Sequence, residues 1–246
     1  MRRWLPVFGA AVYVAGLIAM APATLLDARL AAASGGRLRL TDARGTVWSG
    51  QGVLELRDGA GRAGFAAPLA WRLGARSLLE ARLVYGVRTG NPASRFKVAL
   101  APRRVEVEDA DLRFPAQALG LAVPQLAVLE LRGELRLHAA RLSAGSRYLA
   151  GDATLVWRDA ASALASIAPL GDYELRLEGT GDTVSATLRT LDGPLHLEGR
   201  TGWTLGTRPA LAARAEIAPA QREALAPLLR LIAVEQGDGS FRLTLQ

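Results

Sequence analysis

The stretch Glu130-Leu131-Arg132-Gly133-Glu134-Leu135-Arg136-Leu137-His138 alternates polar residues with leucine or glycine without a break. Successive side chains of an extended strand point to opposite faces, so the leucines here share one face and the charged residues the other. Such a strand is typical of an antiparallel sheet that has water on one side. The stretch therefore predicts an all-β fold.

The same alternation recurs on both sides of this stretch. The clearest examples are Arg37–Leu40, Val53–Arg57, Phe96–Leu100, Val105–Glu108, Tyr173–Glu178, Val184–Arg189, Leu195–Glu198 and Phe241–Leu245. Sequences such as Asp192-Gly193-Pro194 separate them and favour tight turns, because Gly and Asp accept a positive φ. Strands joined by short turns predict an extended, twisted and partly rolled antiparallel meander, forming one β-rich domain over residues 35–246.

Helical periodicity after the N-terminal region is confined to short segments. We expect short helices over Pro115–Gly120 and over Asp159–Ile167, with Asp159 as the N-terminal cap of the second. Pro219–Val234 carries apolar residues at i, i+3, i+4 and i+7, the spacing of an amphipathic helix. This C-terminal helix is expected to cover an open end of the sheet, which would otherwise expose unpaired backbone groups.

The N-terminus carries Arg2 and Arg3, followed by an uncharged run of 23 residues from Trp4 to Leu26. A helix of that length spans about 34 Å, at about 1.5 Å per residue, which is enough to cross a bilayer. The flanking arginines favour a cytoplasmic N-terminus and place the rest of the chain outside the cytoplasm. Residues 1–34 are therefore predicted to form a single-pass membrane anchor with a helical collar, and the anchor residues are Trp4, Leu5, Val12, Leu17, Ile18, Leu25 and Leu26.

A cleaved signal peptide stays open as the alternative to a retained anchor. Two small-residue sites would suit a signal peptidase, Ala21-Pro22-Ala23 and Ala31-Ala32-Ala33, but the long apolar run favours retention. Small residues within the run permit close approach of a second membrane helix and are equally compatible with contact to lipid alone. They are Gly9, Ala10, Gly16 and Ala19.

The composition excludes several classes of function. The 246 residues include no cysteine, which removes thiol nucleophiles, iron–sulfur clusters and cysteine-based zinc sites. The formal charge is +7, and Lys97 is the only lysine among 30 basic residues. The arginines are scattered along alternating strands rather than clustered with aromatic residues, so no nucleic-acid groove is predicted.

Motifs that resemble catalytic or ligand-binding signatures lack the context that such chemistry needs. Gly59-Ala60-Gly61-Arg62-Ala63-Gly64 fits a dinucleotide pattern, but a strand with a proline follows it where a helix is required. Ser49 lacks the flanking glycines of a nucleophile elbow, and His138 and His196 fall on polar strand faces. We expect no catalytic residue, no cofactor, no metal and no small-molecule substrate.

One acidic group offers carboxylates for a divalent cation or for catalysis: Glu106, Glu108, Asp109 and Asp111. Basic residues flank this group on both sides, namely Arg103, Arg104 and Arg113. This mixture favours charge pairing between neighbouring strands over a metal or catalytic site.

The most distinctive string is Gly45-Thr46-Val47-Trp48-Ser49-Gly50, directly after an alternating strand. It resembles the opening motif of type II secretion system protein N. Further matches follow in the order of that family, in the segments 151–157, 170–173, 190–195 and 197–199 and at Gly202-Trp203. The motif residues carried over are Gly45, Thr46, Val47, Trp48, Ser49, Gly50, Trp157, Gly193, Gly199 and Trp203.

The resemblance implies a single-pass bacterial inner-membrane protein with a cytoplasmic N-terminus and a periplasmic β-rich domain. It implies no catalytic residues and no enzymatic activity. The implied partners are the inner-membrane platform proteins of a type II secretion system, together with inner-membrane lipid. A second resemblance, to AsmA-like envelope proteins, implies a lipid-binding β-groove instead. The two differ in the concave face of the sheet, which a scaffold covers and a lipid groove leaves open.

Trp48 has two interpretations within this frame. Its ring can close one end of the sheet, with Gly45 and Gly50 allowing the backbone to turn tightly around it. Alternatively, it can present an exposed aromatic surface to a partner protein. Burial beside turn glycines is the commoner arrangement and is also expected for the other tryptophans, Trp71, Trp157 and Trp203.

Overall fold

The structure is a computed structural model that describes residues 5–58, 61–74, 82–90, 94–101, 103–207, 211–217, 224–225, 233–235 and 241–245. Its helices are α1 (Leu5–Ala19), α2 (Thr24–Ser34), α3 (Gln117–Ala122) and α4 (Pro124–Ala127). Its strands are β1 (Leu38–Gly45), β2 (Ser49–Arg57), β3 (Ala63–Leu73), β4 (Leu83–Thr89), β5 (Arg95–Ala101), β6 (Arg104–Pro115), β7 (Leu131–Gly145), β8 (Tyr148–Ser162), β9 (Gly171–Gly181), β10 (Thr183–Asp192), β11 (Leu195–Thr204), β12 (Leu211–Ile217), β13 (Ala233–Glu235) and β14 (Phe241–Leu245).

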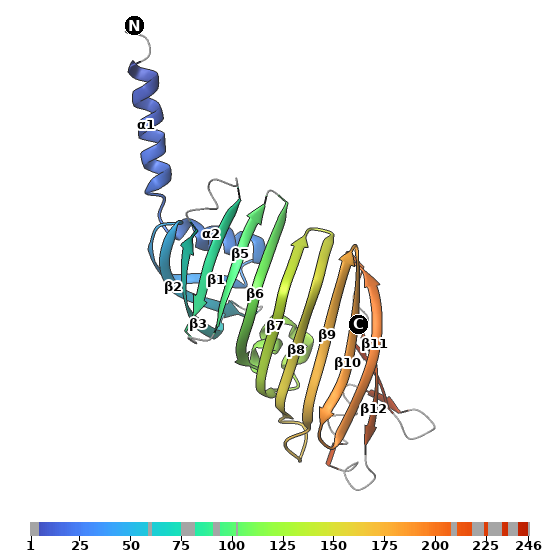
Figure 1. The fold of residues 1–246 in the computed structure, drawn as a ribbon. Helices are drawn as coiled ribbons and strands as arrows, with labels where there is room; N and C mark the ends of the chain where they lie inside the picture. Colours follow the sequence, from blue (N-terminus) through green and yellow to red (C-terminus); the bar gives the residue numbers. More distant parts are fainter. Residues whose placement is uncertain are drawn as a thin grey trace.

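All these strands belong to one 14-stranded antiparallel sheet (Figure 1). Each strand from β1 to β11 pairs with the next one in the sequence, as expected for a meander. The order changes only at the far edge, where β12 pairs with β14 and β13 lies outermost. The predicted antiparallel all-β fold is therefore confirmed. The crossover at its C-terminal edge was not predicted from the sequence.

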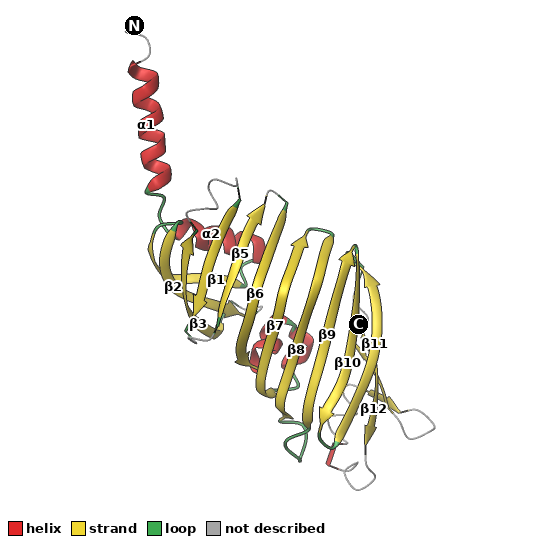
Figure 2. Ribbon diagram, in the orientation of Figure 1, coloured by secondary structure: helices red, strands yellow, loops and turns green. Residues whose placement is uncertain are grey.

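The sheet is curved, and its helices other than α1 lie against one face (Figure 2). Helix α2 packs on the N-terminal strands, and α3 with α4 pack near the middle of the sheet. Leu121 of α3 lies over Gly64 of β3, where a Cβ on the glycine would come within 2.5 Å of a leucine methyl carbon. A helix that follows β6 thus contacts the third strand, because the sheet rolls around it.

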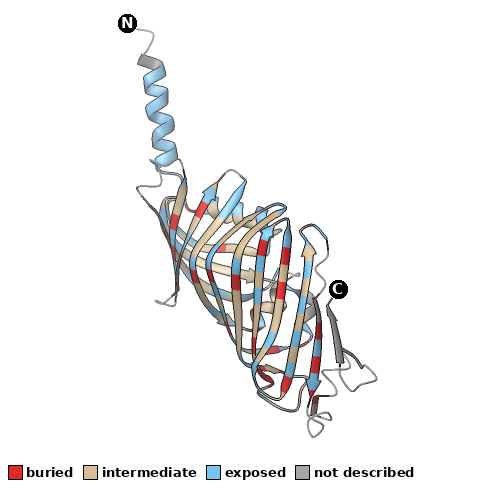
Figure 3. Cartoon of the chain, turned by 45° about the vertical axis from the view of Figure 1, so that its right-hand side comes forward, coloured by how far each residue is buried: buried red, intermediate tan, exposed pale blue. Residues whose placement is uncertain are grey.

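The apolar core lies on this inner face in three clusters (Figure 3). Leu135 of the decisive stretch is fully buried in the largest cluster, and Leu137 packs on a smaller one. The N-terminal cluster joins α2 to the sheet through Leu26 and Leu30, which pack near Trp71. Alternation along the strands therefore produces the predicted division into an apolar inner face and a charged outer face.

The acidic group of the sequence pairs with basic side chains of the neighbouring strands β5 and β7 and with Arg82, which precedes β4. Arg82 binds Glu106, and the other pairs are Arg141–Glu108 at 3.2 Å, Lys97–Asp109 at 3.1 Å and Arg136–Asp111 at 2.6 Å. The expected charge pairing is confirmed, with different partners from those nearest in sequence. The described residues contain no group of three or more potential metal ligands.

The predicted helix over Asp159–Ile167 is wrong. Strand β8 continues to Ser162, with an irregularity in its pairing between Trp157 and Ala160. Asp159 takes a positive φ of 49° there, a conformation that aspartate tolerates, and the fully buried Ala160 re-enters the ladder opposite Gly171. Asp159 is thus a bulge residue and not a helix cap.

The predicted boundaries of two other helices also differ from the structure. Helix α3 begins at Gln117 and runs past Gly120, because Pro115 still belongs to β6. The predicted helix over Pro219–Val234 is wrong at its end, where Ala233–Glu235 forms β13. Ala224 and Leu225 are helical, and Leu225 is fully buried in the largest cluster. The rest of that segment lies outside the described residues.

The uncharged N-terminal run does not form one continuous helix. Helix α1 ends at Ala19 and α2 begins at Thr24, with Pro22 between them. Proline lacks the N–H that a continuing helix requires and disfavours helical geometry in the residue before it. In the part of the chain that the structure describes, no helix is long and apolar enough to span a membrane. The predicted collar helix corresponds to α2.

Candidate functional site

The motif residues Gly45–Gly50 form the turn between β1 and β2, which we call the motif hairpin. The backbone N–H of Thr46 donates to the Ser49 carbonyl over 2.9 Å. The Thr46 hydroxyl accepts from the N–H of Trp48 over 3.3 Å. Gly45 has a φ of 94°, and a Cβ there would lie 2.5 Å from the Ser49 carbonyl oxygen. Only glycine fits this position, since the space and the backbone conformation both exclude a side chain.

The motif hairpin holds the segment between α1 and α2. The N–H of Val47 donates to the carbonyl of Ala21 over 2.9 Å, and the N–H of Ala23 donates to the carbonyl of Gly45 over 3.1 Å. Pro22 and Thr46 form an antiparallel bridge between these two hydrogen bonds. The connection between the helices thus docks on the hairpin by backbone pairing.

Trp48 extends this contact to the end of α1. Its indole Nε1–H donates to the carbonyl oxygen of Ile18 over 2.8 Å. The Ile18 carbonyl, in the last turn of α1, also accepts from the N–H of Ala21 over 3.2 Å, so the indole is its second donor. Trp48 is half-buried. The two interpretations of the sequence were that its ring closes one end of the sheet or stands free for a partner. Instead, its ring joins the sheet to the N-terminal helix.

Trp71 on β3 supports the hairpin from the core side. Its Nε1–H donates to the carbonyl of Thr46 over 3.1 Å, and its side chain is only 6% exposed. The N–H of Leu73 donates to the carbonyl of Trp48 over 2.7 Å. Gly50 lies directly against the Trp71 ring, where a Cβ would be 2.5 Å from Cζ2. The sequence predicts burial of Trp71, but nothing in it indicates that Trp71 binds the motif.

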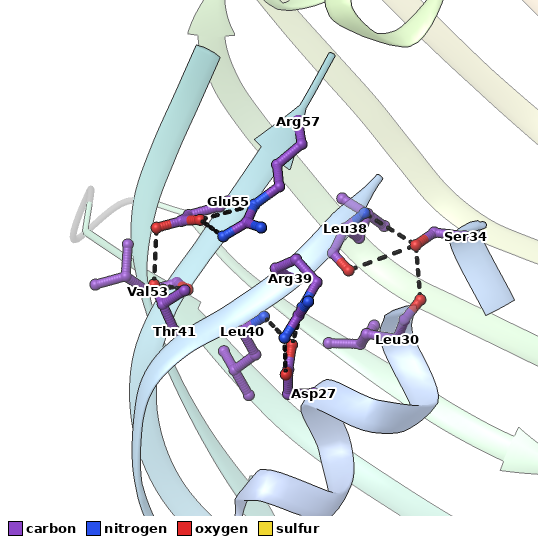
Figure 4. Close-up of polar contacts among 10 residues, drawn as sticks. All are labelled: Asp27, Leu30, Ser34, Leu38, Arg39, Leu40, Thr41, Val53, Glu55 and Arg57. Atoms are coloured by element: carbon purple, nitrogen blue, oxygen red, sulfur yellow. Dashed lines mark hydrogen bonds and ion pairs between the residues drawn. The ribbon is translucent and has the colours of Figure 1, made fainter. Parts of the chain in front are cut away.

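Helix α2 fixes the exposed edge of β1 (Figure 4). Asp27 accepts two hydrogen bonds from the Arg39 guanidinium, over 2.9 and 2.7 Å, and one from the N–H of Leu40 over 2.8 Å. The Arg39 hydrogen bond, helped by that of Leu40, holds the pKa of Asp27 below its usual value. Ser34 accepts from the N–H of Leu38 over 2.9 Å. Side chains of α2 therefore satisfy backbone groups that a free sheet edge would expose.

The predicted anchor residues divide between two environments. Val12, Leu17 and Ile18 lie on α1 with more than half of their surface exposed, and Leu25 at the start of α2 is also exposed. Leu26 packs on the N-terminal core cluster. Leu5 is the first residue of α1, and Trp4 lies outside the described residues. Helix α1 carries no charged residue, and all its residues from Val7 onward are exposed (Figure 3).

Two more motif residues, Trp157 and Gly193, lie near Tyr173 in the part of the sheet formed by β8, β9 and β10. The Trp157 and Tyr173 rings lie 5.9 Å apart, and the Trp157 Nε1–H donates to the carbonyl of Arg132 over 2.9 Å. The Tyr173 hydroxyl lies 3.0 Å from two carbonyl oxygens, those of Leu170 and Leu195. Burial raises the pKa of this phenol. A Cβ on Gly193 would lie 2.3 Å from the Gly171 Cα, and a Cβ on Gly171 would lie 2.5 Å from the Asp192 carbonyl oxygen, so neither position leaves room for a side chain.

The last two motif residues lie apart from these groups. Gly199 occupies the middle of β11, opposite Leu188, and Trp203 lies near the end of β11, opposite Val184. Trp203 and Trp157 are half-buried, so the expected burial is complete only for Trp71. The structure therefore brings together Gly45–Gly50 as one site, while the remaining motif residues support the distant part of the sheet.

The residues considered for catalysis show no convergent arrangement. His138 and His196 are exposed on the outer face, as predicted, and Ser49 is exposed beside Trp48. After Gly61 the chain enters β3 and not a helix, so the glycine pattern lacks the helix N-terminus that a dinucleotide site needs. Gly59 and Ala60 lie outside the described residues.

Comparison with known families identifies the family of the chain. Residues 36–244 match the model of the family described as type II secretion system (T2SS), protein N. No curated protein and no solved structure matches the chain. The match covers most of the chain and includes the motif hairpin.

Proposed function

Because the chain belongs to the type II secretion system protein N family, we propose that it is a non-enzymatic inner-membrane component of that system. In this proposal it contributes to assembly or function of the inner-membrane platform. The platform proteins and inner-membrane lipid are its partners, and it needs no cofactor. The β-sheet acts as a periplasmic scaffold, which α1 holds at the membrane.

One observation carries the proposal, the docking of the α1–α2 connection on the motif hairpin. Two backbone hydrogen bonds and the Trp48 bond to Ile18 join the end of an uncharged, exposed helix to the sheet. Exposed apolar side chains of α1, such as Phe8 at 70% and Val7 at 62%, require an apolar environment around the helix. A helix that sits in a membrane and is bonded to the sheet would hold the scaffold in a fixed orientation.

The covered inner face of the sheet favours a scaffold over the AsmA-like lipid groove. Leu26 and Leu30 of α2 pack on the N-terminal cluster, and Leu119 and Leu126 of α3 and α4 pack on the largest cluster. Protein therefore occupies this face at two places along the sheet. A groove for acyl chains would need a continuous open apolar face.

We place the division of the chain at residue 34, with the anchor and collar in residues 1–34 and the periplasmic domain in residues 35–246. The absence of native cysteine makes this topology testable. Arg176 is exposed on the outer face of β9. An Arg176→Cys variant should react with a membrane-impermeant maleimide in intact spheroplasts, and labelling only after lysis would contradict a periplasmic domain.

Copurification from native membranes tests the proposed function. Tagged full-length protein is isolated in detergent, and the copurifying proteins and lipids are identified by mass spectrometry. We expect platform proteins of the secretion system in near-equal amounts, and a large loss of them with Trp48→Ala. Trp203→Ala serves as the matched control, since Trp203 is a half-buried tryptophan far from α1 in the strand order. Phospholipid without any secretion protein would contradict the proposal and favour the lipid groove.

A further inference from the structure

Four arginines that have no carboxylate partner among the described residues gather on the outer face of the N-terminal strands. We call this group the arginine surface, and it consists of Arg44 on β1, Arg72 on β3, Arg88 on β4 and Arg95 on β5. All four side chains are exposed. They line two adjoining hollows of about 480 and 370 Å³, which share Arg44 and Arg88. Among the described residues that line the two hollows, Asp42 is the one carboxylate, so positive charge is in excess there.

The pairing of β4 with β5 places two of these charges directly opposite each other. Arg88 and Arg95 are cross-strand partners, an arrangement in which like charges destabilise a sheet. Neither side chain forms an ion pair or hydrogen bond with any residue that the structure describes. The strand pairing therefore holds two guanidinium groups together without a counter-charge.

Another pair of opposed arginines shows how the same sheet neutralises such a contact. Arg113 and Arg136 face each other across β6 and β7. Arg113 lies 3.9 Å from Glu134, and Arg136 lies 2.6 Å from Asp111. Arg88 and Arg95 lack such carboxylates among the described residues. The difference indicates that an anion from outside the chain supplies the missing charge at the arginine surface.

The arginine surface continues into an apolar recess beside α1. This recess, of about 790 Å³, lies between Ala15 and Ile18 of α1 and Trp48 and Leu73 of the sheet. Arg72 lines both the recess and the smaller hollow. An apolar cavity that opens onto guanidinium groups matches a ligand with a hydrocarbon part and an anionic part.

We propose that the arginine surface binds the phosphate headgroup of an anionic phospholipid whose acyl chain enters the recess beside α1. Arginine binds phosphate by paired hydrogen bonds from its planar guanidinium, and exposed arginines near a membrane surface attract anionic lipid. This inference rests on the membrane location of α1 in the proposed function. An acidic protein segment would match the charge but not the recess.

The test measures binding of soluble short-chain lipids to the purified full-length protein in a nonionic detergent. The probes are dihexanoyl phosphatidylglycerol, dihexanoyl phosphatidylcholine, inorganic phosphate and an oligoglutamate peptide. The variant is Arg88→Gln/Arg95→Gln. The control is Arg176→Gln/Arg200→Gln, which removes the same charge from exposed outer-face arginines that line a hollow with Glu174 and Glu178.

We expect phosphatidylglycerol to bind the wild type, and the double substitution at Arg88 and Arg95 to weaken it about tenfold or more, since two charge-assisted contacts are lost. The control should stay within about twofold. The Arg88→Gln/Arg95→Gln protein should melt no lower than the wild type in lipid-free detergent, because its opposed charges are gone.

Several results would overturn the proposal. If both double variants weakened phosphatidylglycerol binding equally, the effect would depend on net charge alone and not on the arginine surface. If inorganic phosphate or phosphatidylcholine bound as tightly as phosphatidylglycerol, the site would not be specific for an anionic amphiphile. If oligoglutamate bound more tightly than phosphatidylglycerol, the ligand would be an acidic protein segment and not a lipid. No secretion protein takes part in this assay. A failure here beside successful copurification therefore overturns the lipid site and leaves the proposed function standing.

Discussion

The Nε1–H of Trp48 donates to the carbonyl oxygen of Ile18 over 2.8 Å and joins a turn of the sheet to the end of helix α1. These residues are 30 positions apart in the chain. The bond explains why a tryptophan stands between the turn glycines. A phenylalanine would fill the same space but could not bind the helix.

Trp48→Phe should lower the free energy of unfolding by about 0.5–1.5 kcal/mol, because it removes one hydrogen bond and keeps most of the apolar ring. The measurement is a urea titration of the full-length protein in detergent. Trp203→Phe is the control, since the structure gives the half-buried Trp203 no indole hydrogen bond within its described residues. Equal losses in both variants would show that only ring size matters.

Gly50→Ala should destabilise the protein by about 1–3 kcal/mol, the usual cost of forcing extra volume into a packed site. The added methyl group would meet the Trp71 ring at 2.5 Å and the carbonyl of Arg44. Gly86→Ala on β4 provides the contrast, because its nearest neighbour would lie at an ordinary 3.9 Å. Unfolding free energies measured in urea should separate the two, and a Gly50→Ala protein as stable as Gly86→Ala would show that the hairpin can shift.

Asp27→Asn should destabilise the protein at neutral pH, and the difference from the wild type should shrink in acid. The Arg39 hydrogen bond lowers the pKa of Asp27 in the folded state. A lowered pKa contributes stability above the unfolded-state value, and this contribution is lost as the pH falls through the folded-state value. Melting temperatures should therefore converge at pH values below the ordinary 3.8 of the carboxyl.

Asp42→Asn is the control for this pH dependence. Asp42 is an exposed carboxylate on β1, and no ion pair to it is found within the described residues. Its positive φ of 50° suits asparagine as well as aspartate. The melting temperature of Asp42→Asn should follow that of the wild type across the titration. Parallel behaviour of Asp27→Asn and the wild type would rule out the Asp27–Arg39 link.

Tyr173→Phe should cost about 0.5–1.5 kcal/mol of unfolding free energy, since it deletes a buried hydroxyl that bonds to backbone carbonyls near the β8–β9 connection. Burial raises the pKa of the Tyr173 phenol, so its contribution is complete below the unfolded value near 10 and fades above it. Tyr148→Phe is the comparison, because Tyr148 is half-buried with Arg104 over its ring. The loss should be confined to Tyr173→Phe at pH 7 and diminish at alkaline pH.

Local alternation explains why most strands could be predicted. In Glu130–His138 the charged side and the apolar side are both visible in the sequence, and β7 buries Leu131 and Leu135 as expected. Period-2 alternation depends only on neighbouring residues, so it needs no knowledge of distant contacts. The same holds for tight turns such as Asp192-Gly193, where Gly193 has a φ of 114°.

The errors come from places where distant contacts override local preference. Aspartate is a preferred N-cap residue, so Asp159 suggested a helix, but pairing of Ala160 with Gly171 keeps the chain extended. The run up to Leu26 contains no charged residue, yet Pro22 pairs with Thr46 and lies in a break between α1 and α2. Neither partner is near in sequence.

The candidate site was predictable only as a motif. The glycines and Trp48 could be singled out from the sequence, but their contact with Ile18 and Ala21 depends on how the chain returns after α2. The arginine surface was hidden for the same reason, since scattered arginines become neighbours only through strand register. Charge pattern alone predicted a solvated face.

The central claim is that the motif hairpin holds α1 in a fixed orientation relative to the sheet. Pulsed electron–electron double resonance measures the distance distribution between two spin labels, here on the full-length protein in nanodiscs. The labels are attached at Val12→Cys on α1 and Arg176→Cys on β9, in a chain that has no other cysteine. A Lys97→Cys/Arg176→Cys pair within the sheet gives the width of a rigid distance distribution. With the wild-type hairpin, we predict that the distribution between positions 12 and 176 is about as narrow as the distribution within the sheet. With Trp48→Ala, it should become clearly broader. A broad distribution in the wild type, or no change with Trp48→Ala, would contradict the account.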